Sequence, residues 1–185
     1  MSRLALYTFG VLKRPLADPA PSTREFYEIG GAVYPQISQH PGYLAHADAA
    51  DARRGALFEA DWGSWGDFAV PTWYGKGRTA ETTALAATLS LWTGLRPAFD
   101  AVHTGLHRAA LARRYEWFER TGHPSHVCWW LSGSATPVWR DGVARLEHLH
   151  GHGPTPRAFT FHDAFAPDGT PAGVRAIEAR TPRDP

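Results

Sequence analysis

Two strand-like runs and the helical pattern between them decide the fold: AATLSLW at residues 86–92 and HVCWWL at residues 126–131. The side chains of each run divide between two faces, as they do in a strand of a half-buried sheet. Between the runs, apolar residues recur at the spacing of one helix face, which predicts a single long helix over 95–117. Pro97 falls in the first turn of that helix, where proline is tolerated.

The N-terminal third continues the alternation of strand and helix. Residues 4–12, LALYTFGVL, are β-rich and predict the first strand. Ser22-Thr-Arg-Glu25 has the pattern of a capping box, so we expect a helix to begin there. Gly30-Gly31 and Pro35 predict that this helix is bent or broken. Residues 42–47 predict a short second strand.

The C-terminal part adds a helix after Pro137 and a last strand at residues 158–162. The resulting order of elements contains the split β-α-β pattern, which predicts an α+β fold: a ferredoxin-like antiparallel sheet with helices on one face. At 185 residues, the chain is long enough for one core. We therefore predict a single domain over residues 1–166 with an aromatic-rich insertion near 51–80, followed by a loosely ordered tail over 167–185.

Composition and motifs exclude several classes of function. Lys and Arg total 19 against 18 Asp and Glu, without a block of like charges, so we expect no nucleic-acid partner. No apolar stretch is long enough to span a membrane, so we expect a cytoplasmic protein without membrane contact. The single cysteine, Cys128, excludes an internal disulfide and a cysteine-built metal site. The sequence contains no phosphate loop, dinucleotide fingerprint or Gly-x-Ser-x-Gly elbow, which excludes nucleotide-dependent enzymes and serine hydrolases.

Ten histidines are a large number for a chain of this size. His103 and His107 are four residues apart on the predicted long helix and therefore lie on one face. That spacing suits a two-histidine metal site or an acid–base pair, and it also occurs where one histidine packs on the sheet and the other is solvated. No carboxylate completes a zinc-protease pattern, so we predict no metal. His148, His150 and His152 lie at a helix end, where solvated histidines interact favourably with the helix dipole.

Aromatic residues suggest where a ligand would lie. His126 and Trp130 share a strand face with Cys128, and Trp92 is expected in the same layer on a neighbouring strand. Such a face suits a pocket for a planar ligand, or equally a dimer interface. The excursion over residues 62–74 contains several tryptophans and is either a lid over that pocket or an aromatic cluster that holds a long loop together.

Several segments together resemble the uncharacterised domain-of-unknown-function family 3291, a branch of the dimeric α/β-barrel superfamily. They are LSLWT at 89–93, VHTGLH at 102–107, RRYEWF at 113–118, CWWL at 128–131, GPTP at 153–156 and AFTF at 158–161. The resemblance implies a homodimer formed by sheet-to-sheet contact and a pocket between each sheet and its helices. Relatives in the superfamily include cofactor-free monooxygenases acting on aromatic polyketides, small lyases and isomerases, and haem proteins.

The resemblance also implies a small-molecule tailoring enzyme that acts on a hydrophobic, aromatic or polyketide-like metabolite without a nucleotide cofactor. Its reaction would be monooxygenase-like, or a cyclisation or dehydration. His107 matches the family's helix histidine and is the expected acid or base, with His103 beside it, while an inward-pointing Arg114 would stabilise negative charge. The expected substrate-binding residues are Trp92, Trp130, His126, Tyr7, Trp73 and Phe161.

Two alternatives stay open at the level of the sequence. In the first, the same pocket holds a haem, with His107 or another histidine as the axial ligand and tryptophans against the porphyrin. In the second, the chain is a non-enzymatic module whose Trp-rich surface binds a ligand or docks a partner protein. In the leading interpretation the protein needs no cofactor.

Overall fold

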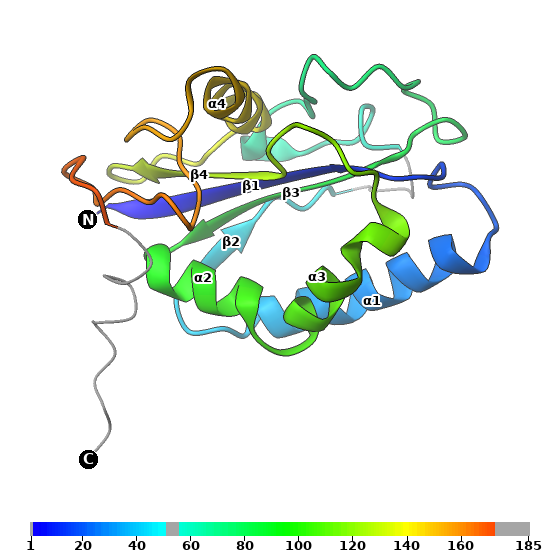
Figure 1. Cartoon of the computed structure of the whole chain (residues 1–185), viewed down its shortest axis with the longest axis horizontal. Coiled ribbons are helices and arrows are strands. Elements are labelled where there is room, and N and C mark those ends of the chain that lie inside the picture. Colours follow the sequence, from blue (N-terminus) through cyan, green and yellow to red (C-terminus); the bar gives the residue numbers. More distant parts are fainter. Residues whose placement is uncertain (1, 51–55, 173–185) are drawn as a thin grey trace.

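The structure, a computed structural model, describes residues 2–50 and 56–172 and is built on a four-stranded antiparallel sheet (Figure 1). Its strand order is β2 (Tyr43–His46), β3 (Leu85–Trp92), β1 (Arg3–Val11) and β4 (His126–Leu131). Each of these strands lies within a residue or two of a predicted one. The α+β class and the antiparallel sheet are therefore confirmed.

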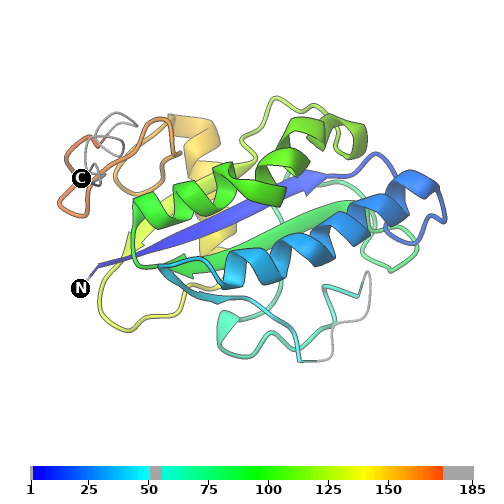
Figure 2. The ribbon, with the colours of Figure 1, turned by 90° about the horizontal axis from the view of Figure 1, so that it is seen from below.

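Helices cover both faces of the sheet rather than one. The face that carries Leu4 and Leu6 packs against α1 (Pro21–Ser38), α2 (Leu95–His103) and α3 (Gly105–Trp117), which lie in front of the sheet in Figure 2. The other face packs against α4 (Trp139–His152). The expectation that all helices share one face was wrong for α4. The physical reason is that both faces of β1 are apolar, so each needs a cover.

The first helix is continuous and begins differently from the prediction. It starts at Pro21 after Ala20, and no side chain caps it, so the expected capping box does not form. It also runs unbroken through Gly30-Gly31 and Pro35 to Ser38. Pro35 removes one backbone hydrogen bond, but it lies in the last turn, where little helix remains to be disrupted.

The predicted long helix is two helices, α2 and α3, separated at Thr104. Thr104 is extended, and Gly105 has a φ of +53°, in the left-handed region that favours glycine. The side chain of Gln36, from α1, packs where a Cβ of residue 105 would lie and accepts the backbone N–H of Leu106 at 3.0 Å. The break therefore depends on a contact from a distant helix.

The expected last strand at 158–162 is not a strand. Phe159 exchanges two backbone hydrogen bonds with Cys128, of 2.7 and 3.0 Å, and the pairing with β4 stops there. The chain turns away at Asp163, whose N–H is accepted by Thr160 Oγ1 at 3.1 Å. Of the expected loose tail, residues 167–172 are described: the backbone N–H of Ala172 bonds to Ala164 O at 2.7 Å. Residues 173–185 lie outside the described residues.

The aromatic insertion packs as a cluster against α4. Trp62 stacks on Phe68 with ring centres 5.6 Å apart, and both contact Trp139 of α4, at 4.9 and 4.8 Å. These rings cover the second face of the sheet together with α4. A sheet-to-sheet contact between two copies would therefore have no bare sheet on this side. Residues 51–55 of the predicted insertion lie outside the described residues.

Candidate active site

A row of polar side chains crosses the sheet on the face covered by α1, α2 and α3. Thr8 of β1 is paired in register with Thr88 of β3 on one side and with His126 of β4 on the other. The two threonine hydroxyls are hydrogen-bonded at 2.7 Å. All three residues remain partly exposed, although they lie in the layer beneath the helices. A polar and accessible row in this layer is where a ligand can be held between sheet and helices.

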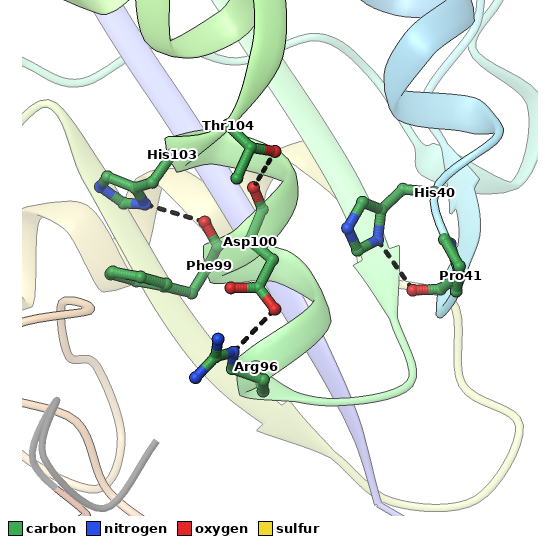
Figure 3. A network of polar contacts seen from close by, with 7 residues as sticks. All are labelled: His40, Pro41, Arg96, Phe99, Asp100, His103 and Thr104. Carbon is green, nitrogen blue, oxygen red and sulfur yellow. Dashed lines mark hydrogen bonds and ion pairs between the residues drawn. The ribbon is translucent and has the colours of Figure 1, made fainter. Parts of the chain in front are cut away.

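His103 ends α2 directly beside this row. Its Nδ1 is 2.8 Å from Phe99 O, and its ring stacks on the Phe99 ring with centres 4.1 Å apart (Figure 3). Because a carbonyl oxygen only accepts hydrogen bonds, Nδ1 carries the proton in this contact. When the ring is neutral, Nε2 is therefore its basic nitrogen.

His107 repeats this arrangement one turn into α3. Its Nδ1 donates to Val102 O at 2.8 Å, so Nε2 is again the basic nitrogen. Burial lowers the pKa of His107 below its usual value, and the nearby charge of His103 lowers it further, against the opposing effect of the Val102 hydrogen bond. His107 is therefore neutral at pH 7 and able to accept a proton.

His126 supplies a third imidazole from the start of β4. Its ring stacks on Phe161 with centres 5.4 Å apart, and His103 meets the same phenyl ring edge-on at 5.6 Å. Burial, and then the charge of His103, lowers the pKa of His126 to about 4. Its Nε2 is buried without a hydrogen-bond partner, which costs about 1–3 kcal/mol in a folded protein. A polar group of a bound ligand would remove that cost.

Imidazoles from α2 and β4 thus contact aromatic side chains, and the imidazole of His107 on α3 lies near His103. We call His103, His107 and His126 the histidine cluster. Because the charge of His103 acts on both of the others, a proton gained by one ring disfavours protonation of its neighbours. Such a group can take one proton from a substrate and return it, which is general acid–base chemistry.

Other predicted site residues do not join the cluster. Arg114 was expected to point inward, but its guanidinium lies on the outer surface, 4.2 Å from the Tyr115 ring centre, and donates to Leu111 O at 2.7 Å. Tyr7 packs under α4 on the opposite face of the sheet, against Trp139. Neither side chain is placed to contact a ligand beside the histidine cluster.

Trp73 also lies with the α4 side of the molecule. It stacks on His123 with ring centres 4.3 Å apart and planes within 3°, and both rings contact His150. The His148 and His152 rings stack on each other at 4.3 Å near the end of α4. The predicted histidine tract is therefore divided between two contacts, and His150 turns toward Trp73.

Trp92 and Trp130 do lie in the helix-facing layer, as predicted. Trp92 is 1% exposed and its indole N–H donates to Ser90 Oγ at 2.9 Å, whereas Trp130 donates to Phe165 O at 2.7 Å. With their polar atoms paired, they serve as apolar walls. Phe161 touches two histidines of the cluster, and Cys128 is fully buried with a pKa raised by burial, as expected of an inert thiol.

Two observations concern a metal or a haem. Among the residues that the structure describes, no three His, Cys, Asp or Glu side chains are grouped so that they could hold a metal ion. Phe99 and Phe161 stack on the rings of His103 and His126.

Two surface hollows are defined elsewhere. The first has a volume of about 300 Å³ and is lined by Asp48, Asp61 and the Trp62–Trp65 turn. The second, of about 50 Å³, lies between Lys13, Thr23 and Trp117. Neither is lined by a residue predicted from the sequence to act on a substrate. No helix in the described part of the chain is long and apolar enough to cross a membrane.

Comparison with known proteins identifies a family and two similar structures. The family described as Domain of unknown function (DUF3291) matches residues 3–175. A protein of unknown function from Nitrosomonas europaea, NE2512, is 9% identical with a TM-score of 0.40, over 75% of this chain and 95% of that one. SnoaB from Streptomyces nogalater, a cofactor-independent oxygenase, is 9% identical with a TM-score of 0.39, over 74% of this chain and 97% of that one. No protein of curated function is significantly similar in sequence.

Proposed function

We propose that this chain, which belongs to the family Domain of unknown function (DUF3291), is a cytoplasmic enzyme. The enzyme removes a proton from a hydrophobic, aromatic small molecule by general-base catalysis at the histidine cluster. The protein needs no nucleotide cofactor for this step. The reaction that follows is oxygenation of the resulting carbanion, in line with the monooxygenase-like activity that the sequence resemblance implies.

One observation carries this proposal: His103 and His126 contact the same phenyl ring beside an accessible polar row, and His107 lies close enough to His103 for the charge of His103 to act on it. Backbone carbonyls hold His103 and His107 with Nε2 as the basic nitrogen, each through a contact of 2.8 Å. Fixing the tautomer in this way prepares the ring to accept a proton without rearrangement.

The surroundings set the class of substrate. Phe99 and Phe161 provide flat apolar contacts beside His103, while Thr8 and Thr88 provide hydroxyls at the sheet. A planar ring system with an oxygen substituent matches both kinds of contact. The buried Nε2 of His126 is suited to bind that oxygen, so that His107 serves as the base and His126 as a contact to the developing negative charge.

The proposed chemistry balances with dioxygen as co-substrate. His107 Nε2 takes a proton from an acidic CH₂ group, the carbanion adds O₂, and the protonated His107 returns that proton to the peroxide anion to give a hydroperoxide. The neutral base then removes the remaining C–H proton as the O–O bond breaks and hydroxide leaves. This second proton joins the hydroxide, so that CH₂ and O₂ become C=O and H₂O. Apolar side chains that exclude water protect the carbanion from reprotonation.

Anthrone tests this proposal because its acidic CH₂ group lies between two aromatic rings and its oxidation gives anthraquinone. We expect the wild-type protein to accelerate oxygen uptake and anthraquinone formation in equal amounts. His107→Gln keeps a side chain of similar size and removes the base, so it should lose the acceleration. Oxygen uptake at the uncatalysed rate with wild-type protein would overturn the proposed oxygenation. The homodimer implied by the resemblance is likewise a proposal, checked by light scattering against twice the chain mass of 20.4 kDa.

A further inference from the structure

Strand β2 contains an irregularity that changes where two side chains point. The pairing register with β3 shifts between Tyr43 and Ala45. In a regular strand Tyr43 and His46 would lie on opposite faces, because they are three residues apart. The extra residue at this bulge brings both to the face covered by α1, and bulges are known to redirect side chains next to functional sites.

The redirected side chains bond to each other. The Tyr43 hydroxyl and His46 Nδ1 are hydrogen-bonded, and we call them the Tyr43–His46 pair. The Tyr43 ring packs edge-on against Trp92 with centres 5.5 Å apart, and Tyr34 of α1 lies 5.3 Å from the His46 ring. All of these residues keep part of their surface exposed except Trp92. The pair is thus accessible and held on an aromatic base.

The pair belongs to the same layer as the histidine cluster. His46 is opposite Ser90 of β3, which lies on the same strand face as Thr88. Thr88 is hydrogen-bonded to Thr8, which is opposite His126. Polar side chains therefore occur on all four strands of this face, with a histidine on each edge strand.

We propose that the Tyr43–His46 pair is the far end of the ligand site and binds a second oxygen substituent of a planar multi-ring ligand. This inference rests on the proposed function, since the near end is the histidine cluster. Edge strands β2 and β4 are separated by three strand spacings, or about 14 Å. Side chains reach inward from both edges, so a rigid ligand of three fused rings with oxygens at both ends spans the distance, and a two-ring ligand does not.

Ring resonances of the histidines test this directly. In full-length protein labelled with ¹³C at the histidine rings, 2,6-dihydroxyanthraquinone, whose hydroxyls lie at opposite ends of the ring system, should shift the signals of His126 and His46 together. The smaller 2-naphthol should shift His126 alone. A shift at only one end with the three-ring compound would overturn the inference and leave the proposed function standing. No shift of either signal would overturn the proposed function itself, and with it this inference.

A conservative variant separates a specific contact from general packing. Tyr43→Phe removes the hydroxyl and keeps the ring on Trp92, so we expect about fivefold weaker binding of the three-ring compound and unchanged binding of 2-naphthol. His40→Gln is the matched control, because His40 also packs on Trp92, at 6.1 Å, but its Nδ1 is bonded to Pro41 O (Figure 3). Equal loss in both variants would contradict a role for the hydroxyl.

Discussion

Acidification should destabilise the folded protein through His126. The pKa of this buried imidazole is about 4 in the folded chain, against about 6.5 when the chain is unfolded. Because the unfolded state binds the proton more readily, the stability contributed by the neutral ring is fully present above pH 6.5 and is lost as the pH falls toward 4. Between pH 7.5 and pH 5.0 the linkage relation gives a loss of about 2 kcal/mol from this group alone.

Urea unfolding at the two pH values measures this loss. His126→Gln removes the titrating group, so the variant should lose about 2 kcal/mol less than the wild type between pH 7.5 and 5.0. Comparing each protein with itself cancels any general destabilisation by the substitution. His162→Gln is the control, since the His162 side chain is 87% exposed and should leave the wild-type pH dependence unchanged. Parallel pH profiles for the wild type and His126→Gln would refute the buried, neutral state of His126.

Three further substitutions test other parts of the structure. His107→Ala should abolish turnover of anthrone, because it removes the base. The circular dichroism spectrum should stay unchanged, because only Nδ1 of this side chain bonds to the backbone. Wild-type turnover in this variant would remove His107 from the mechanism. Arg114→Ala should keep turnover within about twofold, because its guanidinium lies on the surface against Tyr115, and a large loss of kcat would contradict that placement. Gly142→Ala should lower the free energy of unfolding by about 1–3 kcal/mol, because a Cβ there would lie 2.7 Å from Tyr7 Cγ in a closely packed layer. Thermal or urea unfolding measures this loss, and an unchanged midpoint would show that α4 can shift away from β1.

Local patterns were enough to predict the four strands of the sheet, although they also predicted a strand at 158–162 that does not form. The alternation in HVCWWL assigns His126, Cys128 and Trp130 to one face and Val127, Trp129 and Leu131 to the other, and the buried clusters divide in the same way. The helix break at Thr104 was missed because the 3.6-residue period continues across it. Gln36, nearly seventy positions earlier, supplies the bond that makes the break stable. No window around residue 104 contains that information.

The site was only partly predictable for a similar reason. His103, His107 and His126 were candidates because of their spacing or strand face, but the meeting of His103 and His126 around Phe161 depends on how α2 crosses the sheet. Tyr7 and Trp73 were expected at the ligand site because all helices were expected on one face of the sheet. Instead, α4 covers the other face, and both residues pack with it there. The Tyr43–His46 pair was missed because a bulge changes the face of a side chain without leaving a signal in strand alternation.

The most direct test of the histidine cluster as an acid–base site is hydrogen–deuterium exchange at the CH₂ group of anthrone, measured by NMR without oxygen. This measurement isolates proton removal from any later reaction. We expect wild-type protein to accelerate the exchange, and His107→Gln to lose most of that acceleration while Arg114→Ala keeps it. Exchange at the buffer rate in the presence of wild-type protein would contradict the assignment of the cluster to general-base catalysis.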